Sequence, residues 1–404
     1  APGQAGATEM PVLEARAVLG IAVGEFFPQK QGAERSFSWS RVSDSAFDPL
    51  PIDIPDRSFN RWDVGFGLSW ELDFWGRFRR SIDAAQDELD ASVANYDDAI
   101  VTLVSDVATR YIEIRTLQRR RELVVQNEAL QQQTLDIARA KFEGGDVSEL
   151  DVDQATLMLA RTQAEIPLID MLLRIENTSL CVLLGIPAVD LAPRLGIGSI
   201  PTAPPEIVVG VPKDLLRRRP DVRRAERLAA AASERIGIAE ADFYPAISIS
   251  GSFGVSADSF VDLFSGSATR GSFGPSFTWK LLDYGRTASN VRRHQAGFDR
   301  AVAAYEQTVL RANAEVENGM ARFLESQERL RILGEAVEVA KKAVDIALVQ
   351  YREGVVDFNR VALLEQDLLR VEEAHAAARG DVARGLVDTY RALGGGWQIR
   401  EVEE

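Results

Sequence analysis

The chain has 404 residues, and its 46 Lys and Arg against 61 Asp and Glu give a net charge of −15. This acidic balance argues against a protein that binds nucleic acid, because such a protein needs a basic surface. One cysteine (Cys181) and two histidines (His294 and His375) exclude a disulfide framework and come close to excluding a Cys/His zinc site. We therefore expect no enzyme built on these groups, no metal and no cofactor.

The first residues do not look like a natural beginning. Ala1–Met10 has neither an initiator Met nor the charged and apolar segments of a signal peptide. The second half of the chain begins with a basic, Ala-rich helical pattern at Leu215–Leu228, and Ala1–Met10 does not resemble it. We therefore expect that a helix, and a signal peptide before it, precede this sequence in the full gene.

The two halves of the chain form an internal repeat. When the sequence is shifted by 209 positions against itself, glycines and tryptophans from Trp70 to Gly185 align with those of the second half without a gap. A shift of 217 positions aligns the preceding segment, which includes Gly20. The paired residues are Trp70 with Trp279, Gly76 with Gly285, Gly145 with Gly354, Gly185 with Gly394, and Gly20 with Gly237. Each half is therefore predicted to have the same order: helix, two strands, very long helix, turn, second long helix.

Four segments alternate apolar and polar residues with the period of a β-strand. They lie at 36–42, which has the weakest pattern, and at 62–72, 247–256 and 272–281. Such alternation usually means a sheet with one face on a core and the other in water. Here the polar face is mostly Ser, Gly and Thr, and the lengths suit membrane strands of about nine to eleven residues. Because the smallest membrane barrels use about eight strands, several chains would have to share one barrel.

Long helices follow each strand pair. Residues 79–142 and 287–352 are rich in good helix formers, and at about 1.5 Å per residue each would be on the order of 95 Å long. Gly145 and Gly354 predict sharp turns, after which Ser148 and Asp357 are candidate N-caps of the second helices. Helices of this length must pack side by side as a coiled-coil array.

A proline-rich connector precedes the arginine cluster at 217–227. An arginine cluster can bind phosphate, but pairing with neighbouring acids on a solvated helix face is the more ordinary explanation. Cys181 is expected to be a small buried hydrophobic residue, and both histidines are expected to be structural.

Three strings carry a resemblance to a known family. They are Leu215–Val222 (LLRRRPDV), Trp70–Arg77 (WELDFWGR) and Val147–Val152 (VSELDV). With the repeat, they make the chain similar to the TolC family of outer membrane efflux factors, and more narrowly to its NodT-type lipoprotein branch. The resemblance implies a homotrimer with a 12-stranded outer membrane β-barrel that is continued by a periplasmic α-barrel. It also implies a periplasmic adaptor, an inner-membrane pump of the RND type, contact with outer membrane lipids, and a lipid-bearing N-terminal Cys that this sequence lacks.

The resemblance divides this mainly helical α+β chain into four kinds of region. They are an N-terminal helix remnant (1–32), outer membrane strands (33–75 and 244–285), helical hairpins (76–185 and 286–394) and an equatorial connector (186–243 and 395–404). Gly76 and Gly285 would mark the junctions of barrel and helices, and the turn glycines Gly145 and Gly354 would contact the adaptor.

The resemblance also implies a gate at the periplasmic helix turns. Asp151 and Tyr351 match residues that pair across this end in the family. Arg360 takes the place of an inner aspartate and is the repeat equivalent of Asp151, so threefold symmetry would alternate acid and base around the mouth. The ordinary alternative is that Asp151 only favours the dipole of its helix and that Arg360 is solvated.

The function expected from these features is the passive exit duct of a tripartite efflux pump. An outer membrane channel for type I protein secretion and a non-channel coiled-coil protein remain open as alternatives. The net charge predicts an acidic, cation-selective tunnel. The sequence does not identify the transported compound.

Overall fold

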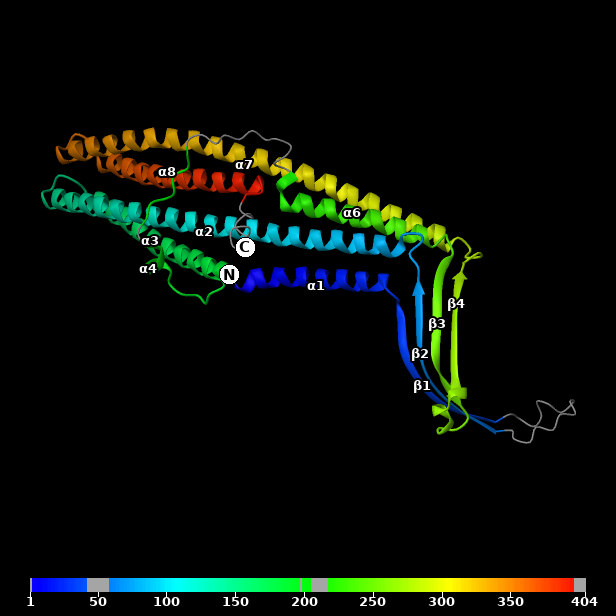
Figure 1. The fold of residues 1–404 in the computed structure, drawn as a ribbon. Coiled ribbons are helices and arrows are strands. Elements are labelled where there is room, and N and C mark those ends of the chain that lie inside the picture. Colours follow the sequence, from blue (N-terminus) through cyan, green and yellow to red (C-terminus); the bar gives the residue numbers. More distant parts are fainter. Residues whose placement is uncertain (1, 42–57, 197, 205–216, 396–404) are drawn as a thin grey trace, which may run out of the picture. The chain divides into compact units, whose positions relative to one another are not determined.

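The computed structural model describes residues 2–41, 58–196, 198–204 and 217–395, with the side chains of residues 2–8 excepted. The fold is mainly helical, with one antiparallel sheet of four strands (Figure 1). The chain divides into a sheet unit (residues 11–92 and 225–305) and a helical unit (residues 1–10, 93–224 and 306–404). The boundaries between the units, at 10/11, 92/93, 224/225 and 305/306, all fall inside helices.

The elements confirm the predicted repeat. Along the chain they are α1 (Pro2–Phe26), β1 (Lys30–Arg41), β2 (Ser58–Glu71), α2 (Arg77–Glu143), α3 (Glu149–Leu184), α4 (Ala192–Leu195), α6 (Pro220–Ala241), β3 (Ala246–Ala257), the short 3-10 turns η2 (Asp262–Phe264) and η3 (Gly266–Ala268), β4 (Thr269–Thr278), α7 (Arg286–Arg352) and α8 (Phe358–Ala392). Helices α2 and α7 both have 67 residues, and their first residues are the equivalent positions Arg77 and Arg286.

The start of the chain is helical. Helix α1 covers Pro2–Phe26, within the region 1–32 where a helix remnant is expected. At the shift of 217 positions, α1 matches α6.

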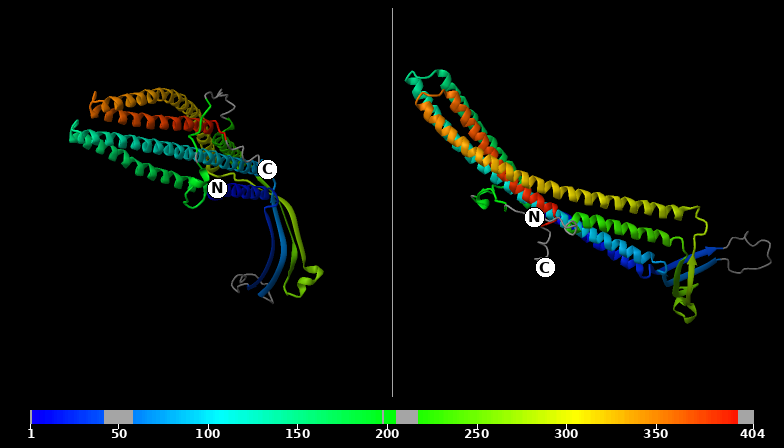
Figure 2. Two further views of the ribbon diagram at one scale, coloured as in Figure 1. Left: turned by 90° about the vertical axis from the view of Figure 1, so that its left-hand side faces the viewer. Right: turned by 90° about the horizontal axis from the view of Figure 1, so that it is seen from above.

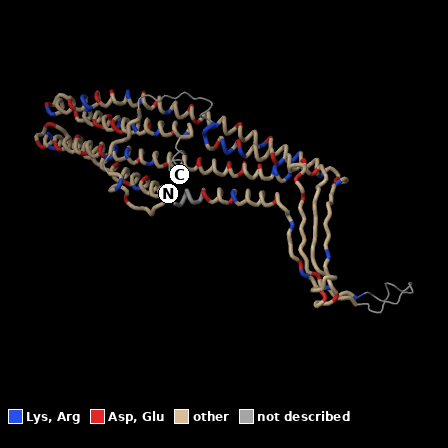
Figure 3. Tube along the Cα trace, in the orientation of Figure 1, with Lys and Arg blue, Asp and Glu red and all other residues tan. Residues whose placement is uncertain are grey.

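The strands follow the order β1-β2-β3-β4, so β1 and β4 are the two edges of the sheet (Figure 1). Strand β1 begins at Lys30, six residues before the predicted segment, because pairing with β2 extends the strand beyond its alternating part. The predicted end at Val42 lies outside the described residues. Few charged residues occur along the strands, whereas the helices carry many (Figure 3).

The two faces of the sheet differ in chemistry, because directly paired residues of antiparallel strands lie on the same face. Pairing of Phe66 with Phe253, and of Val64 with Val255, gives one face its large apolar side chains. The opposite face carries mostly serine and glycine. It includes the paired Ser252 and Ser272, whose hydroxyl oxygens are 2.8 Å apart. The alternation predicted from the sequence thus places the apolar residues on one face, although β4 ends at Thr278 and leaves Trp279 and Leu281 of the predicted segment outside the sheet.

The turns of the two hairpins lie at the same end of the helical unit (Figure 2). A buried apolar cluster near these turns draws residues from all four long helices, including Ala138 of α2, Ala155 of α3, Val344 of α7 and Val361 of α8. These four side chains are at most 2% exposed. The Leu, Val and Ala stripes of the sequence thus form the core, as a coiled-coil array requires.

Two residues of the arginine cluster at 217–227 pair with acids of neighbouring helices. Arg219 donates to the backbone oxygen of Ala392 at 2.7 Å and forms ion pairs with Asp221 at 2.8 Å and Glu315 at 2.7 Å. It therefore joins the start of α6 to the end of α8 and to α7 within the helical unit. In the sheet unit, Arg227 forms an ion pair with Asp87 at 3.1 Å.

Candidate functional site

Both helix turns use the same backbone geometry. Gly145 and Gly354 have φ values of 83° and 75°, in the left-handed region where a side chain causes strain. The residue after each glycine donates its N–H to a carbonyl oxygen five residues earlier, at 2.9 Å in the first turn and 2.8 Å in the second. Asp357 caps α8 by accepting the backbone N–H of Arg360 at 3.1 Å, whereas Ser148 makes no side-chain cap bond.

Tyr351 lies in the last turn of α7 and is buried, with only 1% of its surface exposed. Its ring packs edge-on against Phe358, with ring centres 5.9 Å apart, and the Lys141 ammonium lies 5.4 Å from the ring centre. Its hydroxyl has no hydrogen-bond partner among the described residues. Burial, together with the nearby negative charge of Asp151, raises the pKa of Tyr351 to about 12.

The structure brings two of the three predicted gate residues together. Asp151, in the first turn of α3, is close enough to Tyr351 to affect its pKa, although no hydrogen bond joins them. Arg360 is exposed at the start of α8. Within one chain, no ion pair in the described part joins Arg360 to Asp151 or to another acid.

A set of buried polar residues between α2 and α8 was not predicted. We call it the polar seam: Asn127, Gln131 and Thr134 of α2 with Glu365 and Glu372 of α8. The Thr134 hydroxyl donates to Glu365 Oε1 at 2.6 Å, and the Asn127 amide donates to Glu372 Oε2 at 3.0 Å. The Lys341 ammonium pairs with Glu372 at 3.3 Å. Seam residues recur at intervals of three or four positions on α2 and of seven positions on α8, inside otherwise apolar stripes, and this helical spacing was the signal available in the sequence.

Glu365 is the most confined member of the polar seam. It has no exposed surface, and its second carboxyl oxygen, Oε2, has no partner among the described residues. Burial raises the pKa of Glu365 to about 7, although the hydrogen bond from Thr134 acts in the opposite direction. This carboxyl therefore changes charge near neutral pH.

The junctions of strands and helices use tryptophan side chains as anchors. Trp70 donates its ring N–H to the Phe26 oxygen at 3.1 Å, and its repeat equivalent Trp279 donates to the Phe243 oxygen at 3.0 Å. The junction glycines Gly76 and Gly285 have φ values of 76° and 81°, and a long helix begins directly after each. The Trp279 side chain is 51% exposed, whereas Trp70 is partly buried. Tryptophan at the exposed end of a strand is typical of a membrane boundary.

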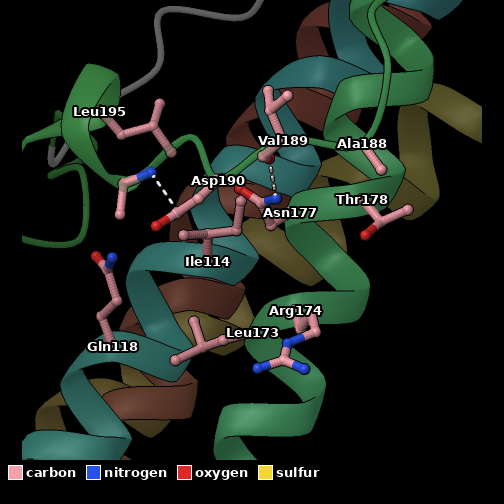
Figure 4. Close-up of a pocket in the computed structure, with 11 residues that line it drawn as sticks. Ile114, Gln118, Leu173, Arg174, Asn177, Thr178, Ala188, Val189, Asp190 and Leu195 are labelled. Carbon is pink, nitrogen blue, oxygen red and sulfur yellow. Dashed lines mark hydrogen bonds between the residues drawn. The ribbon is translucent and has the colours of Figure 1, made fainter.

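A cavity of about 490 Å³ lies between α2, α3 and the segment that follows α3 (Figure 4). Ile114, Leu173 and Leu195 form part of its apolar wall. Asn177 donates to the Val189 oxygen at 2.6 Å and accepts the Leu191 N–H at 2.9 Å. Since this amide is occupied in holding the connector, we assign no ligand to the cavity.

The expected structural residues can be placed as well. Cys181 is fully buried in an apolar cluster at the end of α3, as predicted. No group of three or more His, Cys, Asp or Glu side chains in the described residues could hold a metal ion. Among these residues, no helix combines the length and the apolar character that a membrane crossing requires.

Comparison with known proteins decides the family. The family model described as outer membrane efflux protein matches residues 7–186 and 211–395. The chain belongs to this family. Nodulation protein T of Rhizobium leguminosarum bv. trifolii is 32% identical over 79% of this chain and 67% of that protein. The pyoverdine export outer membrane protein OpmQ of Pseudomonas putida is 28% identical over 98% of this chain and 83% of its own.

The fold agrees with the family assignment. The solved outer-membrane channel OprN superimposes with a TM-score of 0.91, at 32% identity, over 98% of this chain and 87% of that one. This efflux family member is therefore an outer membrane component of an efflux system in a Gram-negative bacterium, where such components work with an adaptor and an inner-membrane pump. The family and these relatives favour efflux over a non-channel coiled-coil protein.

Proposed function

We propose that three copies of the chain form one exit duct, with a shared 12-stranded barrel in the outer membrane and an α-barrel in the periplasm. The observation that carries the proposal is the sheet itself, which has four strands, two edges, one apolar face and one Ser/Gly face. Edge strands leave backbone N–H and C=O groups unpaired, and lipid offers them no partner. Pairing of β4 with β1 of the next copy removes both edges.

The apolar face would then contact lipid, and the Ser/Gly face would line a water-filled lumen. The adaptor would contact the hairpin turns around Gly145 and Gly354, and Gly76 and Gly285 would mark the barrel boundary. The pump is proposed to be of the RND type, as the resemblance to the NodT branch implies. An N-terminal lipid anchor stays a prediction, and the coding sequence upstream of Ala1 tests it.

Asp151, Tyr351 and Arg360 are proposed to close the periplasmic end. The support is their common place at the hairpin turns and the proximity of Asp151 to the Tyr351 hydroxyl. Because Arg360 is exposed and pairs with no acid among the residues that the structure describes, it is available to the Asp151 of a neighbouring copy. Each partly exposed pair would contribute about 0.2–1 kcal/mol, so the closed state could be displaced by an adaptor.

Reconstitution in planar bilayers tests the duct. The purified protein should form ion-conducting channels that prefer cations at low salt, since the net charge is −15. Absence of any conductance, also from variants with an opened tip, would contradict the duct. Anion preference would contradict only the acidic lining.

A further inference from the structure

The Ser/Gly face of the sheet carries a small set of charged side chains. In the strand registers, Glu34 pairs with Gly65, Gly65 with Gly254, and Gly254 with Arg270. These four residues therefore form one row across all four strands on the same face. A charged side chain lies at each end of the row, and two glycines lie between them.

The backbones of β2 and β3 approach closely in this row. A Cβ atom on Gly254 would lie 2.4 Å from the backbone oxygen of Val64, so no other residue fits there without a shift. The absence of side chains leaves room above the strands. Across this gap, the Arg270 guanidinium reaches Asp63 of the adjacent row, with Nη2 3.0 Å from Oδ1.

The environment of this ion pair differs for its two members. The Asp63 side chain is 17% exposed and that of Arg270 is 59% exposed, so the cation is the part that faces open space. Arg61 lies on the same face, two residues from Asp63 and paired in register with Ser38. The charges grouped here are thus Glu34, Arg61, Asp63 and Arg270, and their formal sum is zero.

We propose that Glu34, Arg61, Asp63 and Arg270 form a charged belt in the lumen of the barrel, and that Arg270 sets the preference of this belt between anionic and cationic solutes. The inference rests on the proposed shared barrel. Three copies place three Arg270 side chains in one ring, in a narrow polar channel where fixed charges attract or repel passing ions. The belt would distinguish solutes by charge at the outer membrane, whereas the proposed gate opens and closes the periplasmic end.

The sheet also provides a matched control. Arg35 is next to Glu34 on β1 and pairs in register with Val64, so it lies on the apolar face. Arg35 and Arg270 are both arginines of the membrane strands, but on opposite faces. Replacing either with Gln removes one positive charge from the chain, and only Arg270→Gln removes it from the belt.

The test measures reversal potentials in planar bilayers under a KCl gradient, with each variant first checked for the oligomeric state of the parent. Arg270→Gln should raise the ratio of K⁺ to Cl⁻ permeability by about twofold or more, because the belt becomes net negative and Asp63 loses the cation that it pairs with. Asp63→Asn should lower the ratio, and the double variant should fall between the two. Arg35→Gln should leave the ratio of the parent unchanged.

Two results would overturn the belt. One is an unchanged ratio in both Arg270→Gln and Asp63→Asn while the parent conducts. The other is a change in Arg35→Gln as large as that in Arg270→Gln, which would show that the charge effect does not depend on the face. A parent that forms no channel would contradict the proposed barrel itself, and with it the belt.

Discussion

Glu365 combines complete burial with a carboxyl group that forms no ion pair among the described residues, and this makes the stability of the chain sensitive to pH. Its pKa lies near 7 in the folded chain against an ordinary value of 4.5, so the folded state holds the proton over this range and the unfolded state does not. The free energy of unfolding should therefore fall as pH rises from about 4.5 through about 7. The full effect is on the order of 3 kcal/mol per chain.

The substitution Glu365→Gln should remove this dependence. The amide oxygen still accepts the Thr134 hydroxyl, but no buried charge forms at high pH. The thermal unfolding midpoint of the variant should exceed that of the parent at pH 8, and the difference should disappear near pH 5. Glu338→Gln, at an exposed position of α7, is the control and should leave the pH profile unchanged. Equal pH profiles of Glu365→Gln and the parent would contradict the assignment.

The proposed gate is tested by Asp151→Ala, Arg360→Ala, the double variant and Tyr351→Phe. Tyr351→Phe keeps the ring that packs against Phe358 and removes only a hydroxyl without a partner. Each single variant should raise single-channel conductance, and the second charge substitution should add little once the first is made.

The control for the gate is Glu149→Ala, since Glu149 is also an acid in the first turn of α3. Glu149 shares with Asp151 the favourable position near the helix N-terminus, but only Asp151 contributes to the raised pKa of Tyr351. If Glu149→Ala raises conductance as much as Asp151→Ala does, Asp151 acts only through its helix. If no variant conducts more than the parent, closure lies elsewhere.

Among the secondary-structure elements, the helices and the repeat were predictable because their signals are local. The spacing of apolar residues and the turn glycines, with the absence of proline in α2, α7 and α8, locate α2, α3, α7 and α8 to within a few residues. The beginning of β1 was missed because it depends on pairing with β2, and the polar seam was missed because it depends on which helices pack together. The proximity of Asp151 and Tyr351 was expected from the family resemblance rather than from the residues alone.

Helix packing in the helical unit depends on glycines of α8 that sequence patterns did not reveal. A Cβ atom on Gly385 would lie 2.9 Å from the Phe323 Cα of α7, and one on Gly380 would lie 2.4 Å from the Thr116 hydroxyl of α2. These glycines allow α8 to approach its neighbours closely.

Gly385→Ala should therefore destabilise the chain by about 1–3 kcal/mol, because the added methyl group meets backbone atoms that cannot move aside. The measurement is the thermal unfolding midpoint followed by helical circular dichroism. Gly297→Ala in α7 is the matched control, since nothing lies within 4 Å of its added Cβ. There the substitution should be neutral or stabilising by up to about 1 kcal/mol. A Gly385→Ala variant as stable as Gly297→Ala would contradict the close packing.

The complete duct depends on an assembly that one chain cannot form. Four strands with two free edges cannot close a barrel in lipid, and the exposed Arg360 forms no ion pair with an acid of the described residues. In the proposed assembly, both features would be satisfied where the same surfaces of further copies meet around a symmetry axis. The family assignment supports this reading, since the solved channel OprN has the same fold over 98% of the chain.

The most direct test of the shared barrel is the mass of the purified protein in mild detergent, measured by native mass spectrometry. The account predicts a complex of three copies that dissociates only when the sheet unfolds. A stable, folded monomer, or a monomer whose own sheet is closed, would contradict the account.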